Sequence, residues 1–377
     1  MNVLEHAPGH NPEKTTIKIQ RMRNKYKKRT WLTGSILCRC LLLGSLLWHG
    51  CTMDEKKKAE QPTTQETSKA TAVITHRAFY QNIPSGSGIE AAPDGYYVIG
   101  DDTPFLYHLD KNYKQVAKYE LFDTSEFVNG RIPKPVKPDL ESLASFTYEG
   151  KEYLISLGSG SSPARRKAYV LELPVANARP AVKEVDLSAL FDVLQNNETI
   201  VGEELLNIEG LAFTEDGVYL LQRALNKAGN LILHYKLSEF APFLLEGKPL
   251  PDPELYFVQL PSLQGYQAGF SGAYVLEGKL FFTASIESAP DAIRDGEVLG
   301  SYIGHIPLSD FSKAAPPANP IVAAATLITD EQGKTYIGKA ESLVVEKAGG
   351  TGKYKVVAVS DDDQGHSEIL EVEYRVE

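Results

Sequence analysis

Five short segments of the chain repeat a polar residue, a small residue and an apolar residue in that order. The polar residue is a serine or a glutamate each time, and the five are Ser87, Glu141, Glu209, Ser271 and Glu341. Successive members lie 54, 68, 62 and 70 residues apart. Oxygen ligands that include several carboxylates favour a hard cation such as Ca²⁺. The repeat therefore predicts a calcium site wherever the fold brings these five positions together.

A second group of polar residues follows strands that are expected in the same repeats. Asp101, Asp102, Asp361, Asp362 and His366, with Glu90 as a further member, are candidates for a second metal site or for general-base catalysis. Arg165, Arg166, Arg223 and Asn226 are candidates for binding an anionic group such as a phosphate or a carboxylate. Aspartates after a strand are also common turn formers, and arginines at a loop tip are often merely solvated. Both interpretations stay open.

Other catalytic motifs are absent from the sequence. It contains no His-Glu-x-x-His zinc motif, no glycine-rich phosphate loop before a helix and no Gly-x-Ser-x-Gly elbow. All three cysteines, Cys38, Cys40 and Cys51, lie within the first 51 residues, so the remainder has no thiolate for catalysis or metal binding. Its chemistry must use oxygen and nitrogen groups.

The elements that would position these residues are short strands. From residue 71 onward, runs of β-branched and aromatic residues alternate with Gly, Asp, Asn and Pro, and helical periodicity is scarce. In the third repeat the expected strands are residues 211–214, 218–222, 231–237 and 255–260, and four strands per repeat are typical of a propeller blade. The sequence therefore predicts an all-β fold, a five-bladed β-propeller of four-stranded antiparallel blades. A pair of β-sandwiches is the alternative.

Closure of the ring is expected from the N-terminal strand. The fifth repeat ends the chain after three strands, so residues 71–80 are predicted to join it as the outermost strand, which removes an exposed edge. In a propeller the first strand of each blade lines the central channel, and the five repeated polar residues would then form one ring. Carboxylates in close proximity raise one another's pKa unless a counter-charge is present. A bound cation would supply that charge; the alternative is that some glutamates are protonated or accept hydrogen bonds from backbone amides.

One face of the propeller is the predicted binding face. Loops that join second to third strands open where the inner strands begin, and they carry the aspartates and arginines named above. Long polar loops on a rigid scaffold commonly hold binding and catalytic residues. We therefore expect substrate or partner to bind around the channel mouth.

Paired short segments carry a family resemblance. They are Ser87-Gly88-Ile89-Glu90 with Gly100-Asp101-Asp102, Asn207-Ile208-Glu209-Gly210-Leu211-Ala212 with Asp216-Gly217, and Glu341-Ser342-Leu343 with Ser360-Asp361-Asp362. They resemble the esterase-like phytase family and related uncharacterised bacterial lipoprotein propellers over essentially residues 72–377. The resemblance implies a propeller fold and a phosphoester hydrolase activity. The order Ser, Glu, Glu, Ser, Glu is also similar to the channel ring of the calcium-activated nucleotidases (apyrases), which are five-bladed propellers.

The first 51 residues have the layout of a secretory signal. A basic cluster between Arg21 and Arg29 precedes an apolar stretch that ends in Gly50-Cys51, and this ending resembles a bacterial lipoprotein processing site with Cys51 as the lipidated residue. Met22 is a candidate start, and a transmembrane anchor is the alternative, although the apolar stretch is shorter than about 18 to 20 residues. Residues 52–70 are polar and predict a flexible tether, so the expected propeller domain is 71–377.

The charge of the chain is divided between these parts. Residues 1–51 hold nine Lys or Arg and two acids, a formal net charge of +7, which leaves −17 for residues 52–377 of the total of −10. An acidic domain repels phosphate backbones, so nucleic acid is not an expected partner.

Three functions are consistent with these observations. The first is a metal-dependent hydrolase of esters or phosphoesters, attached to the bacterial cell envelope by its lipid and expected to be a monomer. The second is a non-catalytic propeller that binds a glycan, peptide or protein, with the calcium ion serving stability alone. The third is a lactonase-like enzyme in which calcium polarises the substrate carbonyl.

Overall fold

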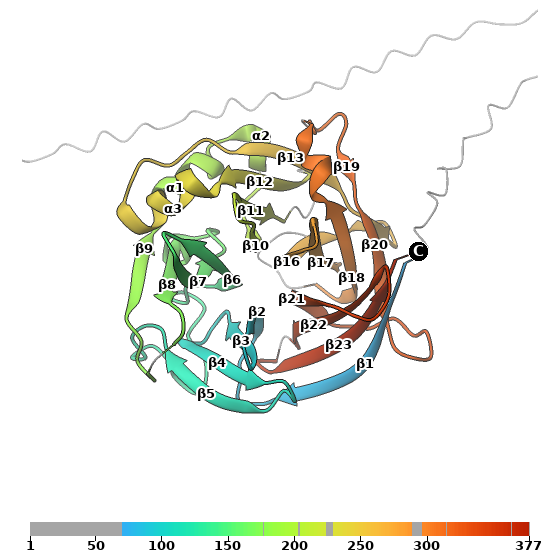
Figure 1. The fold of residues 1–377 in the computed structure, drawn as a ribbon, viewed down its shortest axis with the longest axis horizontal. Helices are drawn as coiled ribbons and strands as arrows, with labels where there is room; N and C mark the ends of the chain where they lie inside the picture. The colour runs from blue at the N-terminus through green and yellow to red at the C-terminus, as the bar shows by residue number, and fades with distance from the viewer. Residues whose placement is uncertain are drawn as a thin grey trace, which may run out of the picture. The chain divides into compact units, whose positions relative to one another are not determined.

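The chain after residue 69 forms antiparallel sheets arranged around a central axis (Figure 1). The computed structural model describes residues 70–376, except 176, 203, 224–228, 289–295, 314 and 363. They belong to one compact unit, Thr63–Glu377. The prediction of an all-β fold is confirmed. Cys51 and Asn226 lie outside the described residues.

Three sheets follow one another along the first part of the chain, each in sequence order. The first contains β2 (Gly86–Ala92), β3 (Gly95–Gly100), β4 (Phe105–Asp110) and β5 (Gln115–Glu120). The second contains β6 (Leu140–Tyr148), β7 (Lys151–Gly158), β8 (Lys167–Glu172) and β9 (Val182–Asp186). The third contains β10 (Ile208–Phe213), β11 (Gly217–Gln222), β12 (Asn230–Lys236), β13 (Glu254–Gln259) and the short edge strand β19 (Ile321–Val322).

The fourth sheet has eight strands and is built from two antiparallel groups. One group contains β16 (Gly269–Leu276), β17 (Lys279–Glu287), β18 (Val298–Pro307) and β20 (Ala324–Thr329). The other contains β21 (Lys339–Lys347), β22 (Lys353–Asp361), β23 (Ser367–Arg375) and β1 (Thr71–Tyr80). A short parallel pairing between β1 and β20 joins the groups. A hairpin of β14 (Ser262–Leu263) and β15 (Tyr266–Gln267) precedes β16.

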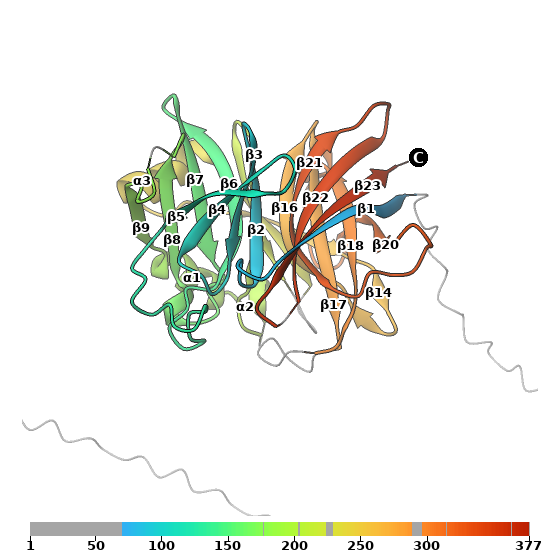
Figure 2. The same cartoon turned by 90° about the horizontal axis from the view of Figure 1, so that it is seen from below.

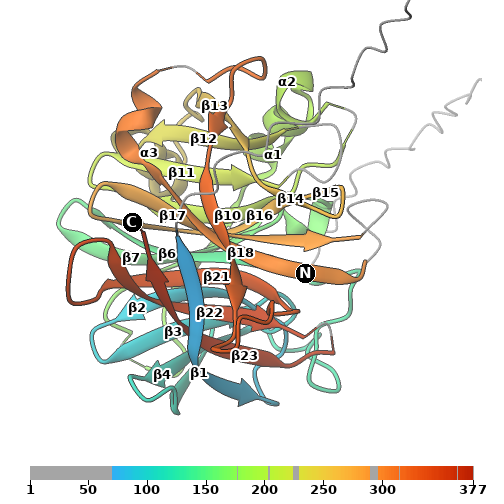
Figure 3. The same cartoon turned by 90° about the vertical axis from the view of Figure 1, so that its right-hand side faces the viewer.

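The N-terminal strand closes the ring beside the C-terminal strand. β1 pairs antiparallel with β23 over its whole length, from Thr71 opposite Arg375 to Tyr80 opposite Ser367. The predicted pairing of residues 71–80 with the last repeat is therefore confirmed. Figures 2 and 3 show β1 beside β23 from two further directions.

Tight turns fix the register of several hairpins. Glu149 and Gly150 join β6 to β7 with φ angles of 50° and 76°, and Glu277 and Gly278 join β16 to β17 with 49° and 69°. Two successive positive φ angles match the right-handed twist of the flanking strands. These two Glu-Gly pairs are thus hairpin turns.

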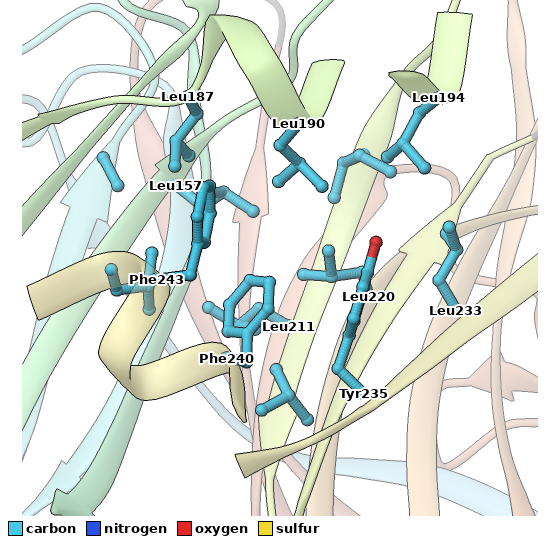
Figure 4. Packing of buried hydrophobic residues seen from close by; sticks show 14 of the residues in the cluster. Leu157, Leu187, Leu190, Leu194, Leu211, Leu220, Leu233, Tyr235, Phe240 and Phe243 are labelled. Carbon is cyan, nitrogen blue, oxygen red and sulfur yellow. The ribbon is translucent and has the colours of Figure 1, made fainter. Parts of the chain in front are cut away.

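Helices cover the outer part of the second and third sheets, and the sequence analysis missed them. They are α1 (Ser188–Gln195), α2 (Glu198–Val201) and α3 (Leu237–Glu246), with short 3₁₀ turns η1 (Pro163–Arg165) and η2 (Leu308–Ser312). Leu190 and Leu194 of α1 and Phe240 of α3 are buried against Leu220 and Tyr235 (Figure 4). The helices thus extend the hydrophobic core between two neighbouring sheets.

The innermost strands of the sheets form the wall of the channel. β2 contacts β6, β6 contacts β10, β10 contacts β16, β16 contacts β21, and β21 contacts β2. This closed sequence of contacts brings the five predicted segments together, because each of them lies on one of these strands.

Candidate functional site

Each residue of the predicted ring occupies an equivalent position in its inner strand. In all five strands the register shifts by one residue: Gly86 and Gly88 have partners on β3, whereas Ser87 between them has none. The same shift leaves Glu141, Glu209, Ser271 and Glu341 as the extra residues of their strands. A β-bulge of this kind re-aims the side chain of the extra residue. Five bulges therefore place the two serines and three glutamates at equivalent positions of the five inner strands.

A glycine follows three of the five bulges, and at two of these glycines a larger residue would meet atoms of the neighbouring inner strand. A Cβ atom on Gly272 would lie 2.6 Å from the carbonyl oxygen of Glu341, and one on Gly88 would lie 2.9 Å from the side chain of Leu143. Both contacts are too short for a methyl group. The small residue of the repeated segment thus allows neighbouring inner strands to pack together.

The two serines of the ring link neighbouring inner strands. Ser87 Oγ donates a hydrogen bond of 2.5 Å to the carbonyl of Leu140, and Ser271 Oγ donates one of 2.6 Å to the carbonyl of Ala340. Each acceptor immediately precedes a ring glutamate. The serine hydroxyls therefore hold Glu141 and Glu341 in place, and their lone pairs remain able to accept a further bond.

Glu209 belongs to a network of two carboxylates and two cations, in which Glu287 is the other carboxylate. Arg223 Nη1 is 3.4 Å from Glu209 Oε1, and its Nη2 is 2.5 Å from Glu287 Oε1. Lys339 Nζ is 3.6 Å from the same Glu287 oxygen. Burial raises the pKa of Glu209 above its ordinary value, whereas Arg223 and Lys339 outweigh burial and lower the pKa of Glu287. These cations supply part of the counter-charge that the carboxylates require.

Glu341 is the third glutamate of the ring, and it is buried close to other charged groups. Its side chain is 8% exposed, and its Oε2 finds no hydrogen-bond partner within the described part of the chain. Burial, together with the negative charges of Glu209 and Asp361, raises the pKa of Glu341 to about 8 despite the nearby Lys339 and Arg223. Burial thus favours the protonated form of Glu341.

Asp101, Asp139 and Glu141 form a compact carboxylate cluster that includes one residue of the ring. One ligand oxygen from each lies within 4.8 Å of the others. Burial raises the pKa of Asp101 to about 6, and burial with the charges of Asp139 and Glu209 raises the pKa of Glu141 well above its ordinary value. Lys137 Nζ forms ion pairs with Asp101 and, at 2.9 Å, with Asp139 Oδ1. One ammonium group thus faces three carboxyls.

The remaining predicted residues near the mouth are held by ion pairs. Arg131 Nε is 2.5 Å from Asp102 Oδ2, and Arg165 Nη1 is 2.5 Å from Asp139 Oδ2. Arg166 Nη1 is 2.5 Å from Asp192 on α1. All three arginines that were candidates for anion binding, Arg165, Arg166 and Arg223, are therefore paired with carboxylates of the protein. A substrate anion would have to displace one of them.

Asp362 and His366 form a local pair in the turn between β22 and β23. His366 Nδ1 is 2.7 Å from Asp362 Oδ2, and the backbone amides of His366 and Gln364 donate to Asp362 Oδ1. These hydrogen bonds outweigh burial and lower the pKa of Asp362. Asp362 thus caps the turn, as the alternative interpretation of the aspartates proposed, and the contact also holds the imidazole of His366.

Four residues of the site were not found from the sequence: Lys137, Asp139, Glu287 and Lys339. Lys137 and Asp139 lie in the loop before β6, and Asp139 has a φ of 54°. Their signal was the sequence Lys137-Pro138-Asp139, two positions before Glu141. Glu287 and Lys339 end and begin strands, where charged residues are common and carry no distinctive pattern.

The cluster of Asp101, Asp139 and Glu141 fits a hard divalent cation in its donor set. All its ligand atoms are carboxylate oxygens, which Ca²⁺ prefers. Asp101 Oδ1 is buried and accepts no hydrogen bond from any described residue, so one lone pair is available for a ligand. The negative charge of the cluster is partly compensated, because Lys137 pairs with Asp101 and Asp139, and Arg165 also pairs with Asp139.

Similarities to solved structures are weak. The glutaminyl cyclase of Myxococcus xanthus is 13% identical over 83% of this chain and 100% of that chain, with a TM-score of 0.44. The Bacillus subtilis arabinanase Arb43A is 12% identical over 79% and 96%, with a TM-score of 0.38. A mutant α-L-arabinanase of Cellvibrio cellulosa is 13% identical over 78% and 92%, with a TM-score of 0.40. Similarity at this level assigns no activity to the chain.

A search of the curated proteins found no match. None of the helices in the described residues is both long and apolar enough to cross a membrane. A family model described as a family of unknown function, DUF6929, matches residues 82–374. That range includes all five bulges and the carboxylate cluster, and the chain belongs to this family.

Proposed function

We propose that this chain is a five-bladed β-propeller that binds a divalent cation, expected to be Ca²⁺, at the mouth of its central channel. The five equivalent bulges support the blade count, since each inner strand begins one antiparallel group of strands. The observation that carries the cation site is the approach of ligand oxygens of Asp101, Asp139 and Glu141 to within 4.8 Å of one another.

The proposed site lies at one side of the predicted ring rather than at its centre. Glu141 belongs to both, whereas Glu209 is engaged by Arg223 and Asn207. Asp101 Oδ1 and the carboxylate of Glu141 would be the first ligands, and Asp139 would be shared with Lys137. Cation binding would then weaken the Lys137 ion pairs and lower the pKa of Glu141, because a positive charge favours the ionised carboxylate.

Calcium titration of the metal-free protein tests this proposal. Added Ca²⁺ should raise the thermal midpoint of the wild type, because a ligand that binds the folded state alone stabilises it. Glu141→Gln should remove this rise, whereas Glu331→Gln, which changes an exposed glutamate in a turn, should retain it. A midpoint that chelator and calcium leave unchanged in the wild type would overturn the proposal.

A metal-dependent hydrolase is the second candidate function. The observation that favours it is Glu341, a buried carboxyl with a pKa of about 8 and an unpartnered Oε2 within the described residues. Such a group can donate a proton to a leaving oxygen near neutral pH. A bound cation would supply polarisation of a substrate oxygen. The predicted base residues Asp361, Asp362 and His366 lie in the same face, at the end of β22 and in the turn after it.

Turnover assays separate the enzyme from a binding protein. Nitrophenyl phosphate, phytate, carboxylic esters and lactones should be tested with and without Ca²⁺, on the wild type and on Glu341→Gln. Loss of a calcium-dependent activity in Glu341→Gln would support the hydrolase. No turnover on any of them would leave a non-catalytic propeller that binds a glycan, peptide or protein.

Attachment to the bacterial cell envelope through a lipid on Cys51 is a further part of the proposal. It rests on the basic cluster, the apolar stretch and the position of Cys51 in the sequence. Mass spectrometry of the protein from a bacterial membrane fraction should find an acylated cysteine at the mature N-terminus. Cys51→Ser should move the protein to the soluble fraction, and an unprocessed, unmodified Cys51 would exclude lipidation.

A further inference from the structure

A pocket lined by both polar and apolar side chains lies near the start of β21. It encloses about 490 Å³ between the segment that leads into β21, the turn from β22 to β23, and the end of β1. Its lining includes Arg77 and Phe79 of β1, Tyr336 and Ile337 before β21, and Asp362 and Gln364 of the turn. A pocket of this volume is large enough for a small-molecule ligand. Lys339, Asp361 and Asp362, which line this pocket, also belong to the candidate site above, whereas Arg77, Phe79, Tyr336 and Ile337 do not.

The floor of the pocket is a fixed polar group. The Tyr336 hydroxyl donates to Glu368 Oε2 at 3.0 Å and lies 2.7 Å from Ser360 Oγ. Arg77 stacks on the Tyr336 ring at 5.0 Å from its centre and lies 3.8 Å from Glu368 Oε1. Each side chain is therefore held by another before any ligand arrives, which reduces the entropy that binding would cost.

Apolar side chains flank this polar floor without being buried by it. Phe79 is 57% exposed and Ile337 is 59% exposed. The centres of the Phe79 and His366 rings lie 5.4 Å apart, and the two rings are tilted by 49°. This contact restricts the orientation of the Phe79 ring. An exposed aromatic side chain at the edge of a polar pocket offers an apolar surface to a ligand that also forms hydrogen bonds.

The charged side chains of the pocket have interaction partners within the protein. Arg77 pairs with Glu368, and Asp362 pairs with His366. Lys339 pairs with Glu287, and Asp361 also has an interaction partner. These side chains are partly exposed, and a neutral polar ligand could bind beside them without separating any pair. The carboxylates of this pocket are also not among the groups whose ligand atoms approach within metal-binding distance. The arrangement therefore favours a neutral polar ligand over a metal ion.

We infer that this pocket binds a neutral saccharide. Sugar hydroxyls both donate and accept hydrogen bonds, which suits the carboxylate oxygens of Asp362 and Glu368 and the exposed amide of Gln364. The C–H face of a sugar ring would pack on Phe79. The inference goes beyond the proposed cation binding and does not depend on it, because none of the cation ligands lines the pocket.

Binding measurements on the full domain test the inference. Cellobiose, maltose, xylobiose and N,N′-diacetylchitobiose are titrated by calorimetry and by ligand-observed NMR, alongside inorganic phosphate, spermidine and adenosine. At least one disaccharide should bind saturably. Phe79→Ala should weaken that binding about tenfold, Phe79→Trp should keep it, and Gln364→Ala should weaken it severalfold.

A matched control separates loss of binding from loss of folding. Val322→Ala removes an apolar side chain of 60% exposure on β19, which does not line the pocket, and should leave disaccharide affinity and thermal midpoint unchanged. The inference is overturned if no disaccharide binds, if Phe79→Ala binds as the wild type does, or if phosphate, spermidine or adenosine is preferred. Calcium titration of the same samples reports the cation site separately, so failure of one proposal is distinguishable from failure of the other.

Discussion

Substitution of Glu90 tests whether burial on the inner strands raises the pKa of a carboxyl group. Glu90 lies on β2 and is 6% exposed. Its Oε1 accepts a hydrogen bond of 2.9 Å from its neighbour Ala91, and its Oε2 accepts one of 3.1 Å from the amide of Ser145 on β6. Burial raises the pKa of Glu90 to about 7, although both amide bonds act in the opposite direction.

The direction of the pH effect follows from this raised pKa. The folded state binds the Glu90 proton more tightly than the unfolded state, so the stabilisation is present below about pH 4.5 and is lost as the pH rises towards about 7. The pKa of Glu90 differs by about 2.5 between the folded and unfolded states, and at 1.36 kcal/mol per pKa unit this difference amounts to about 3 kcal/mol. Glu90→Gln removes the titration. The free energy of unfolding of the variant, minus that of the wild type, should therefore rise by up to about 3 kcal/mol across this range.

Urea unfolding in the presence of chelator measures that difference at each pH. Glutamine replaces one acceptor oxygen with an amide, so the variant should be less stable than the wild type at low pH by about 1 kcal/mol and more stable near pH 7. Glu331→Gln is the control, because its side chain is exposed. Parallel stability curves for wild type and Glu90→Gln would refute the reasoning, since Glu90 would then titrate alike in both states.

Three further predictions concern the ring and its surroundings. Arg223→Ala should lower the free energy of unfolding by about 3 to 5 kcal/mol, because it removes the cation that two buried carboxylates share and leaves Lys339 as the remaining partner of Glu287; urea unfolding that matches the wild type would contradict this. Gly272→Ala should cost about 1 to 3 kcal/mol through overpacking against the Glu341 carbonyl, whereas Gly349→Ala, with no atom within 4 Å of the new Cβ, should cost much less in the same assay. Calcium affinity measured by calorimetry should increase as the pH rises through about 6, because Asp101 must lose its proton to become a ligand; a flat profile would exclude Asp101 from the site.

The strands and the ring positions were predictable because their signals are local and repeated. Alternating apolar residues indicated the strands, and the recurring polar and small residues marked positions that the structure shows to be bulges. The closing role of residues 71–80 followed from counting strands, and β1 confirms it. The recurrence of a polar and a small residue in five segments can be read from the sequence without knowledge of the fold.

The pairing of charges was not predictable for a physical reason. Lys137 and Asp139 lie in an irregular loop, and Arg223 meets Glu287 from another sheet, 64 residues away along the chain. Such contacts depend on how the sheets are placed around the axis, which no local pattern encodes. The helices α1 and α3 were missed because they have only 8 and 10 residues, too few to give a clear period of 3.6.

Anomalous diffraction from crystals grown with Ca²⁺, or with Mn²⁺ in its place, would test the central proposal most directly. We expect a peak at about 2.3 to 2.6 Å from oxygens of Asp101 and Glu141 in the calcium crystal, with Asp139 as a further ligand and Lys137 shifted away from Asp101. A channel mouth without a peak, in which Lys137 still pairs with Asp101 and Asp139, would contradict it.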